Sequence, residues 1–122
     1  MLPIVVNYKG IILSLGSNIG DRETNLSLAL LELASIAQIK SVSSIYETEA
    51  LLMKNQANFY NIAIEIEYTK NANNLLDEIK TIEINLGRKK IIRYGPRIID
   101  IDIIFFRGEN ISTDLLTIPH YA

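Results

Sequence analysis

Hydrophobic and polar positions in the first part of the chain predict a strand, a helix and a second strand. GIILSLGSNIGD begins at Gly10 as a short apolar strand and ends in turn-forming residues. Asp21 then has the position and chemistry of a helix N-cap. The apolar residues of the helix recur at helical spacing and are Leu26, Ala29, Leu30, Leu33 and Ile36. The next stretch, IKSVSSIYETEA, predicts a strand with inward-facing Ile39, Val42 and Ile45.

The second part of the chain continues with a loop, a strand, a helix and a last strand. ALLMKNQAN has no clean period, which predicts a mobile loop. NFYNIAIEIEY alternates strictly: its apolar face holds Tyr60, Ile62, Ile64, Ile66 and Tyr68, and its other face holds Phe59, Asn61, Ala63, Glu65 and Glu67. A helix is predicted over 74–86, with Leu75, Leu76, Ile79, Ile82 and Leu86 inward. After Gly95-Pro96 an apolar strand begins near Ile98.

The predicted element order is β-α-β-β-α-β, which is the ferredoxin-like order of an α+β protein. In this fold the helices cover one face of an antiparallel sheet, and the other face stays available for a binding site. With 122 residues the chain is long enough for one hydrophobic core, so we expect a single domain over 1–122.

Composition narrows the class of protein. The chain has no cysteine, which excludes disulfides and thiolate metal sites and fits a reducing cytoplasm. The N-terminus is apolar but is interrupted by Asn7, Lys9 and Gly10, so we expect neither a signal peptide nor a membrane span.

The net charge of −2 conceals one basic segment. Arg88, Lys89, Lys90, Arg93 and Arg97 place five cations and no acid in ten residues, against seven cations and fourteen acids elsewhere. An acidic protein with one basic segment suits a small anionic ligand better than nucleic acid, which usually needs a broad basic face. The alternative is an ordinary solvated basic loop.

Two aspartates interrupt the last apolar strand, in RYGPRIIDIDIIFF. Strand alternation puts Asp100 and Asp102 on one face, with Cα atoms about 6.6 Å apart. A pair of carboxylates suits Mg²⁺, which takes its other ligands from water and substrate phosphates, and two such ions assist phosphoryl transfer. The alternative is that each aspartate forms a structural salt bridge with a nearby arginine.

Several other side chains have matching chemistry. Arg88, Arg93 and Arg97 offer guanidinium groups that bind phosphate oxygens in a bidentate manner. His120, the single histidine, follows the aspartate strand in LTIPHY. On the open sheet face, Asn61 offers an amide to the edge of a nitrogen heterocycle, and Phe59 offers an aromatic surface.

Motifs along nearly the whole chain resemble the hydroxymethyl-dihydropterin pyrophosphokinase family of folate biosynthesis. They are LSLGSNIGD, SSIYETEA, the Q-x-x-F-x-N of QANFYN, IEINLGRKK, RYGPRIIDIDIIFF and LTIPHY, in the family's order and approximate spacing. The resemblance implies ATP-dependent transfer of pyrophosphate to the hydroxymethyl group of a reduced pterin, with release of AMP. The partners it implies are ATP and a reduced pterin; we also expect a monomer, with no nucleic acid and no membrane as partners.

The resemblance assigns roles to individual positions. Asp100 and Asp102 match the ligands of two magnesium ions. The residues that match phosphate and nucleotide contacts are Arg88, Lys90, Arg97, Ile103 (through its backbone), Thr117, His120 and Tyr121. The residues that match the pterin pocket are Thr48, Leu51, Phe59, Asn61 and Tyr94, the last in place of a usual tryptophan.

The chain also departs from the family pattern. Glu49 and Ala50 replace prolines, Leu115 replaces an arginine of some members, and the Gly87–Tyr94 stretch is about one residue short. Family members continue beyond position 122 with an arginine, a second pterin-stacking aromatic and a helical region. The missing tail leaves open a truncated or non-catalytic nucleotide-binding domain of the same fold. A less favoured alternative is an RNA-binding ferredoxin-like domain, which would need aromatic residues on the exposed faces of the central strands, and IILSL offers none.

Overall fold

The computed structural model describes residues 8–50, 56–87 and 96–120 and is an α+β structure, as the sequence predicts. Its elements in chain order are β1 (Ile11–Ser17), α1 (Arg22–Ala34), β2 (Gln38–Val42), β3 (Tyr46–Thr48), β4 (Phe59–Glu67), α2 (Ala72–Asn85), β5 (Asp100–Phe106), β6 (Ile111–Ser112) and β7 (Thr117–Ile118).

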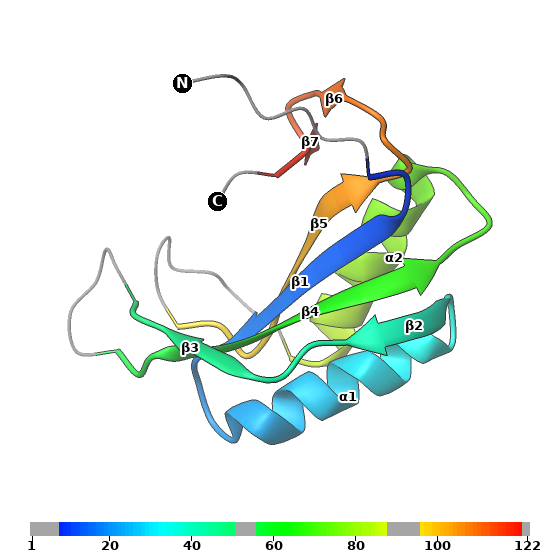
Figure 1. Ribbon diagram of the computed structural model, residues 1–122. Helices are drawn as coiled ribbons and strands as arrows, with labels where there is room; N and C mark the ends of the chain where they lie inside the picture. The colour runs from blue at the N-terminus through cyan, green and yellow to red at the C-terminus, as the bar shows by residue number, and fades with distance from the viewer. Residues whose placement is uncertain (1–7, 51–55, 88–95, 121–122) are drawn as a thin grey trace.

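An antiparallel sheet forms the centre of the molecule (Figure 1). Its strand order is β2-β4-β1-β5, and β3 also pairs with β4. The short strands β6 and β7 form a separate antiparallel pair, which the sequence reasoning did not predict. β1 is therefore central, with β4 on one side and β5 on the other, and the register places Gly16 opposite both Asn61 and Asp100.

The hydrophobic core lies between the sheet and its two helices, which cover the same face in Figure 1. Alternate residues of each long strand point into this core because side chains along a strand alternate between faces. The buried strand residues are Ile11, Leu13 and Leu15 of β1, Ile62, Ile64 and Ile66 of β4, and Ile101, Ile103 and Phe106 of β5. From the helices come Leu26, Ala29, Leu33, Ala72, Leu75, Ile79 and Ile82. The opposite face of the sheet carries polar residues such as Ser14, Asn61 and Asp102 together with apolar ones such as Ile12 and Phe59.

Both helices begin at side-chain caps. Asp21 Oδ1 accepts from the Thr24 backbone N–H at 3.0 Å, which confirms the predicted N-cap. Asn71 Oδ1 accepts from the Asn74 N–H at 2.8 Å, so α2 begins at Ala72, two residues before the predicted start. In each case the side chain satisfies an N–H group that the helix leaves without an internal partner.

One strand prediction is wrong. The stretch predicted as a single strand forms β2 and β3, and a register shift between Ile39 and Ser41 interrupts the pairing of β2 with β4. Ile39 packs against the core as predicted, but Val42 and Ile45 are exposed. The shift changes which residues face the core, and Ile45 lies between the two strands, where alternation no longer decides its direction.

Neither of the two described helices has the length and apolar character needed to cross a membrane.

Candidate functional site

Asp100 and Asp102 lie on the sheet face that the helices leave uncovered. Within β5 they alternate with Ile101 and Ile103, which are buried in the core, so the prediction that both carboxylates share a face is confirmed. The side chains of Asp100 and Asp102 are 32% and 49% exposed. Each aspartate is thus accessible to a ligand, while its neighbours anchor the strand.

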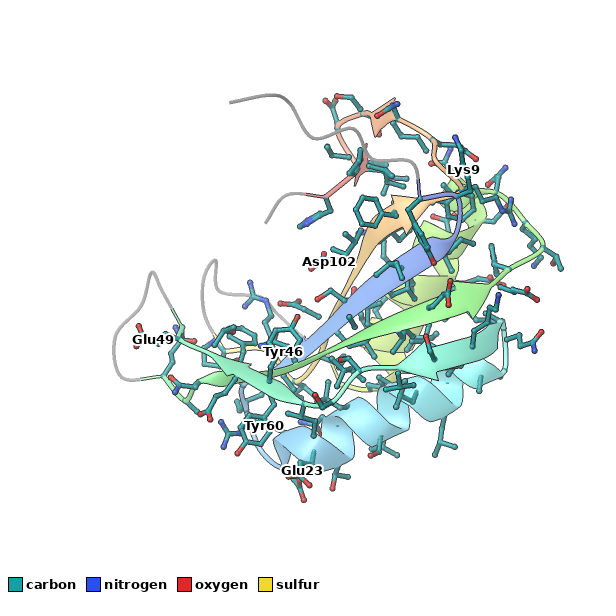
Figure 2. The ribbon with its side chains drawn as sticks, viewed as in Figure 1. Lys9, Glu23, Tyr46, Glu49, Tyr60 and Asp102 are labelled. Atoms are coloured by element: carbon teal, nitrogen blue, oxygen red, sulfur yellow. The ribbon has the colours of Figure 1, made fainter. Side chains whose placement is uncertain are left out.

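Small residues of β1 separate the aspartates from the polar residues of β4. Gly16 pairs with Asp100 on one side and with Asn61 on the other, and Ser14 similarly pairs with Asp102 and Ala63. Asn61 and Asp100 are therefore two strand spacings apart, roughly 10 Å between Cα positions. The small side chains between them leave the sheet surface open, and Figure 2 shows Asp102 along this sheet.

Of the residues predicted to bind pterin, those that the structure describes come together at one end of β4. Asn61 Nδ2 donates to Thr48 Oγ1 at 2.9 Å and to the Tyr46 backbone carbonyl at 3.3 Å. Phe59 lies beside Gly16: a Cβ at that position would be 3.4 Å from the Phe59 ring. The amide and the aromatic surface are thus neighbours on the open face. Leu51 and Tyr94, the other two predicted pterin residues, lie outside the described residues.

Arg97, a predicted phosphate contact, lies three residues before the start of β5. Its Nε lies 3.7 Å from Asp100 Oδ1, and its side chain is only 13% exposed. The structural salt bridge considered above is therefore present for Asp100. Asp102 has a different neighbour: its Oδ1 lies 3.8 Å from His120 Nε2. The imidazole attracts this carboxylate as an ion pair only when it is protonated. Arg88, Lys90 and Arg93 lie outside the described residues.

A cleft of about 340 Å³ runs along the outer edge of β5. It brings together five predicted site residues: Asp100, Asp102, Ile103, Thr117 and His120. The His120 backbone N–H donates to the Ile104 carbonyl at 3.1 Å, which ties the segment after β7 to β5. The side chain of Ile103 is buried, so only its backbone is suited to the predicted nucleotide contact. Tyr121, the remaining predicted nucleotide residue, lies outside the described residues.

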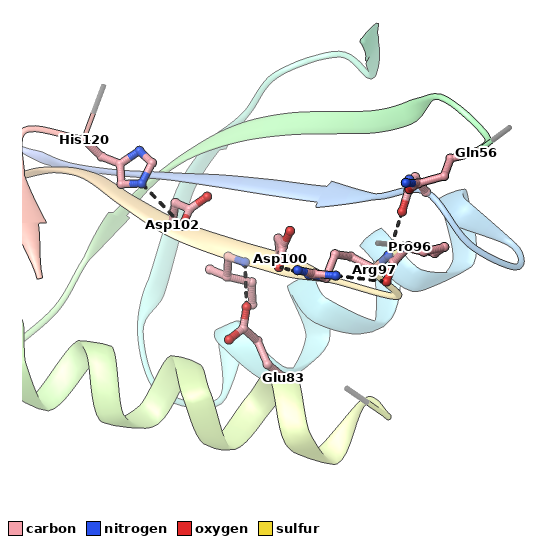
Figure 3. A network of polar contacts seen from close by, with 9 residues as sticks. Gln56, Glu83, Pro96, Arg97, Asp100, Asp102 and His120 are labelled. Atoms are coloured by element: carbon pink, nitrogen blue, oxygen red, sulfur yellow. Dashed lines mark hydrogen bonds and ion pairs between the residues drawn. The ribbon is translucent and has the colours of Figure 1, made fainter. Parts of the chain in front are cut away.

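Sequence reasoning missed two buried polar residues beside the site. Glu83 of α2 is 4% exposed and lines the cleft, and its Oε2 accepts from the Ile101 N–H at 2.9 Å, between the two aspartates (Figure 3). Asn18, 2% exposed, accepts through Oδ1 from the Arg97 N–H at 2.7 Å. Two features of the sequence could have indicated them. Glu83 lies among the inward-facing apolar positions of α2, and Asn18 directly follows β1.

A larger hollow, of about 660 Å³, lies at the other end of β1. Lys9, Glu65 and Arg107 are among its lining residues, and none of the predicted site residues within the described segments lines it. In Figure 2, Lys9 is far from Glu49 and from Tyr46, which pairs with Asn61 of β4. The larger hollow is therefore not the candidate site, because the predicted site residues line the smaller cleft along β5.

The carboxylates at the site suit magnesium better than a metal held entirely by protein ligands. Within the described segments, no group of three or more His, Cys, Asp or Glu residues could hold a metal ion. Asp100 and Asp102 supply oxygen ligands only, and both are partly exposed. Mg²⁺ commonly takes one or two carboxylates and completes its shell with water and substrate phosphates. The donor set therefore fits magnesium that arrives with a phosphorylated substrate.

Comparisons with known proteins show which family the chain resembles in sequence. Residues 12–122 match the family described as 7,8-dihydro-6-hydroxymethylpterin-pyrophosphokinase (HPPK). The chain is 46% identical over 110 residues to a 2-amino-4-hydroxy-6-hydroxymethyldihydropteridine pyrophosphokinase of Bacillus subtilis, with 88% of this chain and 66% of that protein covered. It is 40% identical over 108 residues to the protein of the same name from Aquifex aeolicus, with 88% and 68% covered.

A pea (Pisum sativum) protein named as a mitochondrial folate synthesis bifunctional protein is 40% identical over 120 residues, which cover 98% of this chain and 23% of that protein. The chain thus spans about two thirds of the length of the two bacterial relatives. The chain belongs to the 7,8-dihydro-6-hydroxymethylpterin-pyrophosphokinase family.

Proposed function

We propose that this chain transfers pyrophosphate from ATP to the hydroxymethyl group of 6-hydroxymethyl-7,8-dihydropterin and releases AMP, as a step of folate biosynthesis. The names of the two bacterial relatives state this class of activity for those proteins. The observation that carries the proposal is the row Asn61–Gly16–Asp100 across three neighbouring strands. It puts groups suited to a heterocycle beside groups suited to a metal-bound polyphosphate.

Asp100 and Asp102 are the residues that would hold magnesium, two ions in our proposal. When bound, the metal neutralises charge on the phosphate oxygens and so makes the phosphorus easier to attack. Arg97 supplies a permanent positive charge next to Asp100. We assign Arg88, Lys90, Thr117, His120, Tyr121 and the Ile103 backbone to the nucleotide. These residues bind and orient ATP and exclude water from its phosphates.

The pterin is oriented by the residues at the start of β4 and in β3. The Asn61 amide, held by Thr48 and the Tyr46 carbonyl, recognises the edge of the ring, and Phe59 covers one ring face. We assign Leu51 and Tyr94 to the remaining walls. Orientation of this kind supplies much of the rate in phosphoryl transfer, because the protein itself contributes little covalent chemistry.

In the proposed reaction, the hydroxymethyl oxygen of the pterin attacks the β-phosphorus of ATP in line. A bond forms between that oxygen and the β-phosphorus, and the bond from the β-phosphorus to the oxygen that bridges it to the α-phosphorus breaks. AMP leaves with the electron pair of the broken bond, and the hydroxyl proton is released to solvent. The proposal needs no side chain of the protein as a strong base.

We further propose that the fold is ferredoxin-like and that 1–122 forms a single domain. The strand order β2-β4-β1-β5, with β2 and β3 together as the second strand of the motif, supports this topology. The absence of cysteine supports a reducing compartment, which we take to be the cytoplasm. We also propose a monomer, which light scattering of the purified chain would test.

Identification of the reaction products tests the proposed function. Purified protein is incubated with ATP, Mg²⁺ and the reduced pterin, and the nucleotides are separated by chromatography. We expect AMP, one for each pterin diphosphate formed, and a loss of turnover by orders of magnitude in Asp102→Asn. Asp77→Asn is the matched control, since Asp77 is an exposed carboxylate of α2 that does not line the cleft. ADP as the product, or full activity in Asp102→Asn, would refute the proposal.

A further inference from the structure

Asn18 connects two segments that lie far apart in the sequence. Its side-chain amide donates through Nδ2 to Gln56 Oε1 at 3.1 Å and to the Ala57 carbonyl at 3.2 Å. The other end of the same amide accepts, through Oδ1, the Arg97 backbone N–H at 2.7 Å. The Asn18 backbone N–H in turn donates to the Arg97 carbonyl at 3.0 Å. One planar group therefore joins the segment before β4 to the segment before β5.

The two joined segments lead to the two halves of the proposed site. Residues 56–58 run directly into Phe59 and, two residues later, Asn61. Arg97 precedes β5, where its guanidinium approaches Asp100. Figure 3 shows Gln56 near Pro96 and Arg97, with Asp100 farther along the same network. Asn18 thus links the two segments at their ends, in addition to the pairing of β4 and β5 with β1.

We infer that Asn18 is a positioning residue that aligns the pterin hydroxymethyl group with the β-phosphorus of ATP; this inference rests on the proposed function. The amide is rigid and 2% exposed, so neither segment can shift alone without leaving a buried polar group unsatisfied. Reacting atoms must be held close and in line, and a misplacement of about 1 Å costs roughly 10²-fold in rate. Asn18 touches neither substrate in this account and acts through Arg97 and residues 56–58.

Two neighbouring side chains provide matched controls. Asn25 is also an asparagine with two amide hydrogen bonds, but Nδ2 donates to Ser17 Oγ and the Ile19 carbonyl, within one turn. Within the described segments, Arg22 contacts one of the two joined segments: Nη1 donates to the Asn58 carbonyl at 2.8 Å, and the guanidinium lies 3.8 Å from the centre of the Tyr60 ring. Asn25→Ala thus removes hydrogen bonds without separating the segments, and Arg22→Ala loosens one segment only.

Steady-state kinetics of AMP formation separates positioning from binding. For Asn18→Ala we expect kcat to fall roughly 10²-fold, while the KM values for ATP and pterin change less than about threefold. Asn25→Ala should keep both constants near the wild-type values, and Arg22→Ala should raise the KM for pterin more than it lowers kcat. Gln56→Ala removes one acceptor of the Asn18 amide and should give a smaller fall in kcat. It serves as the second variant if Asn18→Ala does not fold.

A kcat of Asn18→Ala within about threefold of wild type would overturn the inference and leave the proposed function standing. A change confined to KM would do the same, because it would mean that Asn18 shapes binding rather than alignment. If Asn25→Ala loses as much kcat as Asn18→Ala, the effect comes from general weakening of the turn, and the inference fails. A wild-type chain that forms no AMP would instead overturn the proposed function itself.

Discussion

Replacing Gly16 with alanine should weaken pterin binding and leave nucleotide binding unchanged. Gly16 lies on the open face of β1, opposite Asn61 and Asp100. A methyl group there would be 2.9 Å from Asn61 Oδ1 and 3.4 Å from Phe59 Cδ1, and its three nearest atoms all belong to these two residues. The substitution therefore acts on the pterin side of the site and not on the aspartates.

The size of the effect follows from the contact distances. An ordinary carbon–oxygen contact needs about 0.5 Å more than the 2.9 Å available, so the Asn61 amide must move by about that amount. The same movement stretches its 2.9 Å hydrogen bond to Thr48 Oγ1. Two displaced hydrogen bonds to the pterin, at about 0.5–1.5 kcal/mol each, give about 1–3 kcal/mol. Affinity for pterin should therefore fall roughly 5- to 150-fold.

Titration calorimetry with 6-hydroxymethylpterin, in the presence of Mg²⁺ and a non-hydrolysable ATP analogue, measures this change. The free energy of unfolding should change by less than about 1 kcal/mol, because alanine lowers the entropy of the unfolded chain and partly offsets the crowding. In the Asn61→Ala background the amide is gone, so Gly16→Ala should cost much less. Equal losses in both backgrounds, or an equal loss of nucleotide affinity, would show that Asn61 is not the residue displaced.

Two further predictions concern the supports of the site and the pH dependence of stability. Glu83→Leu leaves the buried Ile101 N–H without its acceptor and should lower the free energy of unfolding by about 1–3 kcal/mol. Glu83→Gln keeps an acceptor and should lower it less. Equal free energies of unfolding for the two variants in urea titrations would contradict this. Burial, followed by the hydrogen bond to Glu78, raises the pKa of Tyr68, so its contribution to stability is complete below about pH 10 and is lost as the pH rises further. Tyr68→Phe should therefore lose less stability than wild type between pH 9 and 11. The variant should keep the loss of stability that comes from Tyr8, because burial raises the pKa of Tyr8 to about 12. Identical profiles of stability against pH for wild type and Tyr68→Phe would refute the role of Tyr68.

The sequence contained the order of the main elements because their periodicities are strong. The alternation from Phe59 to Glu67 predicts both faces of β4, and the apolar spacing of α1 predicts its buried residues. The prediction that Val42 and Ile45 face the core is wrong, because the pattern of residues in an edge strand does not reveal a register shift. The pair β6–β7 was missed because two-residue strands are too short to establish a period.

For the site, spacing alone could place Asp100 and Asp102 on one face, since that depends only on strand geometry. The row from Asn61 through Gly16 to Asp100 depends on which strands are neighbours and in what register, which no local pattern specifies. The contacts of Asn18 with Arg97 and Gln56 span 79 and 38 residues, so they become visible only after the chain has folded.

The proposed role of Asp100 and Asp102 is to bind a metal-bound nucleotide rather than to stabilise the fold. Asp102 tests it most directly, since its neighbour His120 is 3.8 Å away and partly exposed, and the Arg97–Asp100 pair stays intact. The decisive measurement is the melting temperature of wild type and Asp102→Asn, first in EDTA and then with Mg²⁺ and a non-hydrolysable ATP analogue.

In EDTA we predict that Asp102→Asn melts at or above the wild-type temperature, because the substitution relieves repulsion between like charges. With the magnesium nucleotide at a hundred times its Kd, wild type should gain about 2.7 kcal/mol, a rise of several degrees, and the variant should gain far less. A variant that melts well below wild type in EDTA, yet gains as much from the nucleotide, would contradict the account and make Asp102 a structural residue.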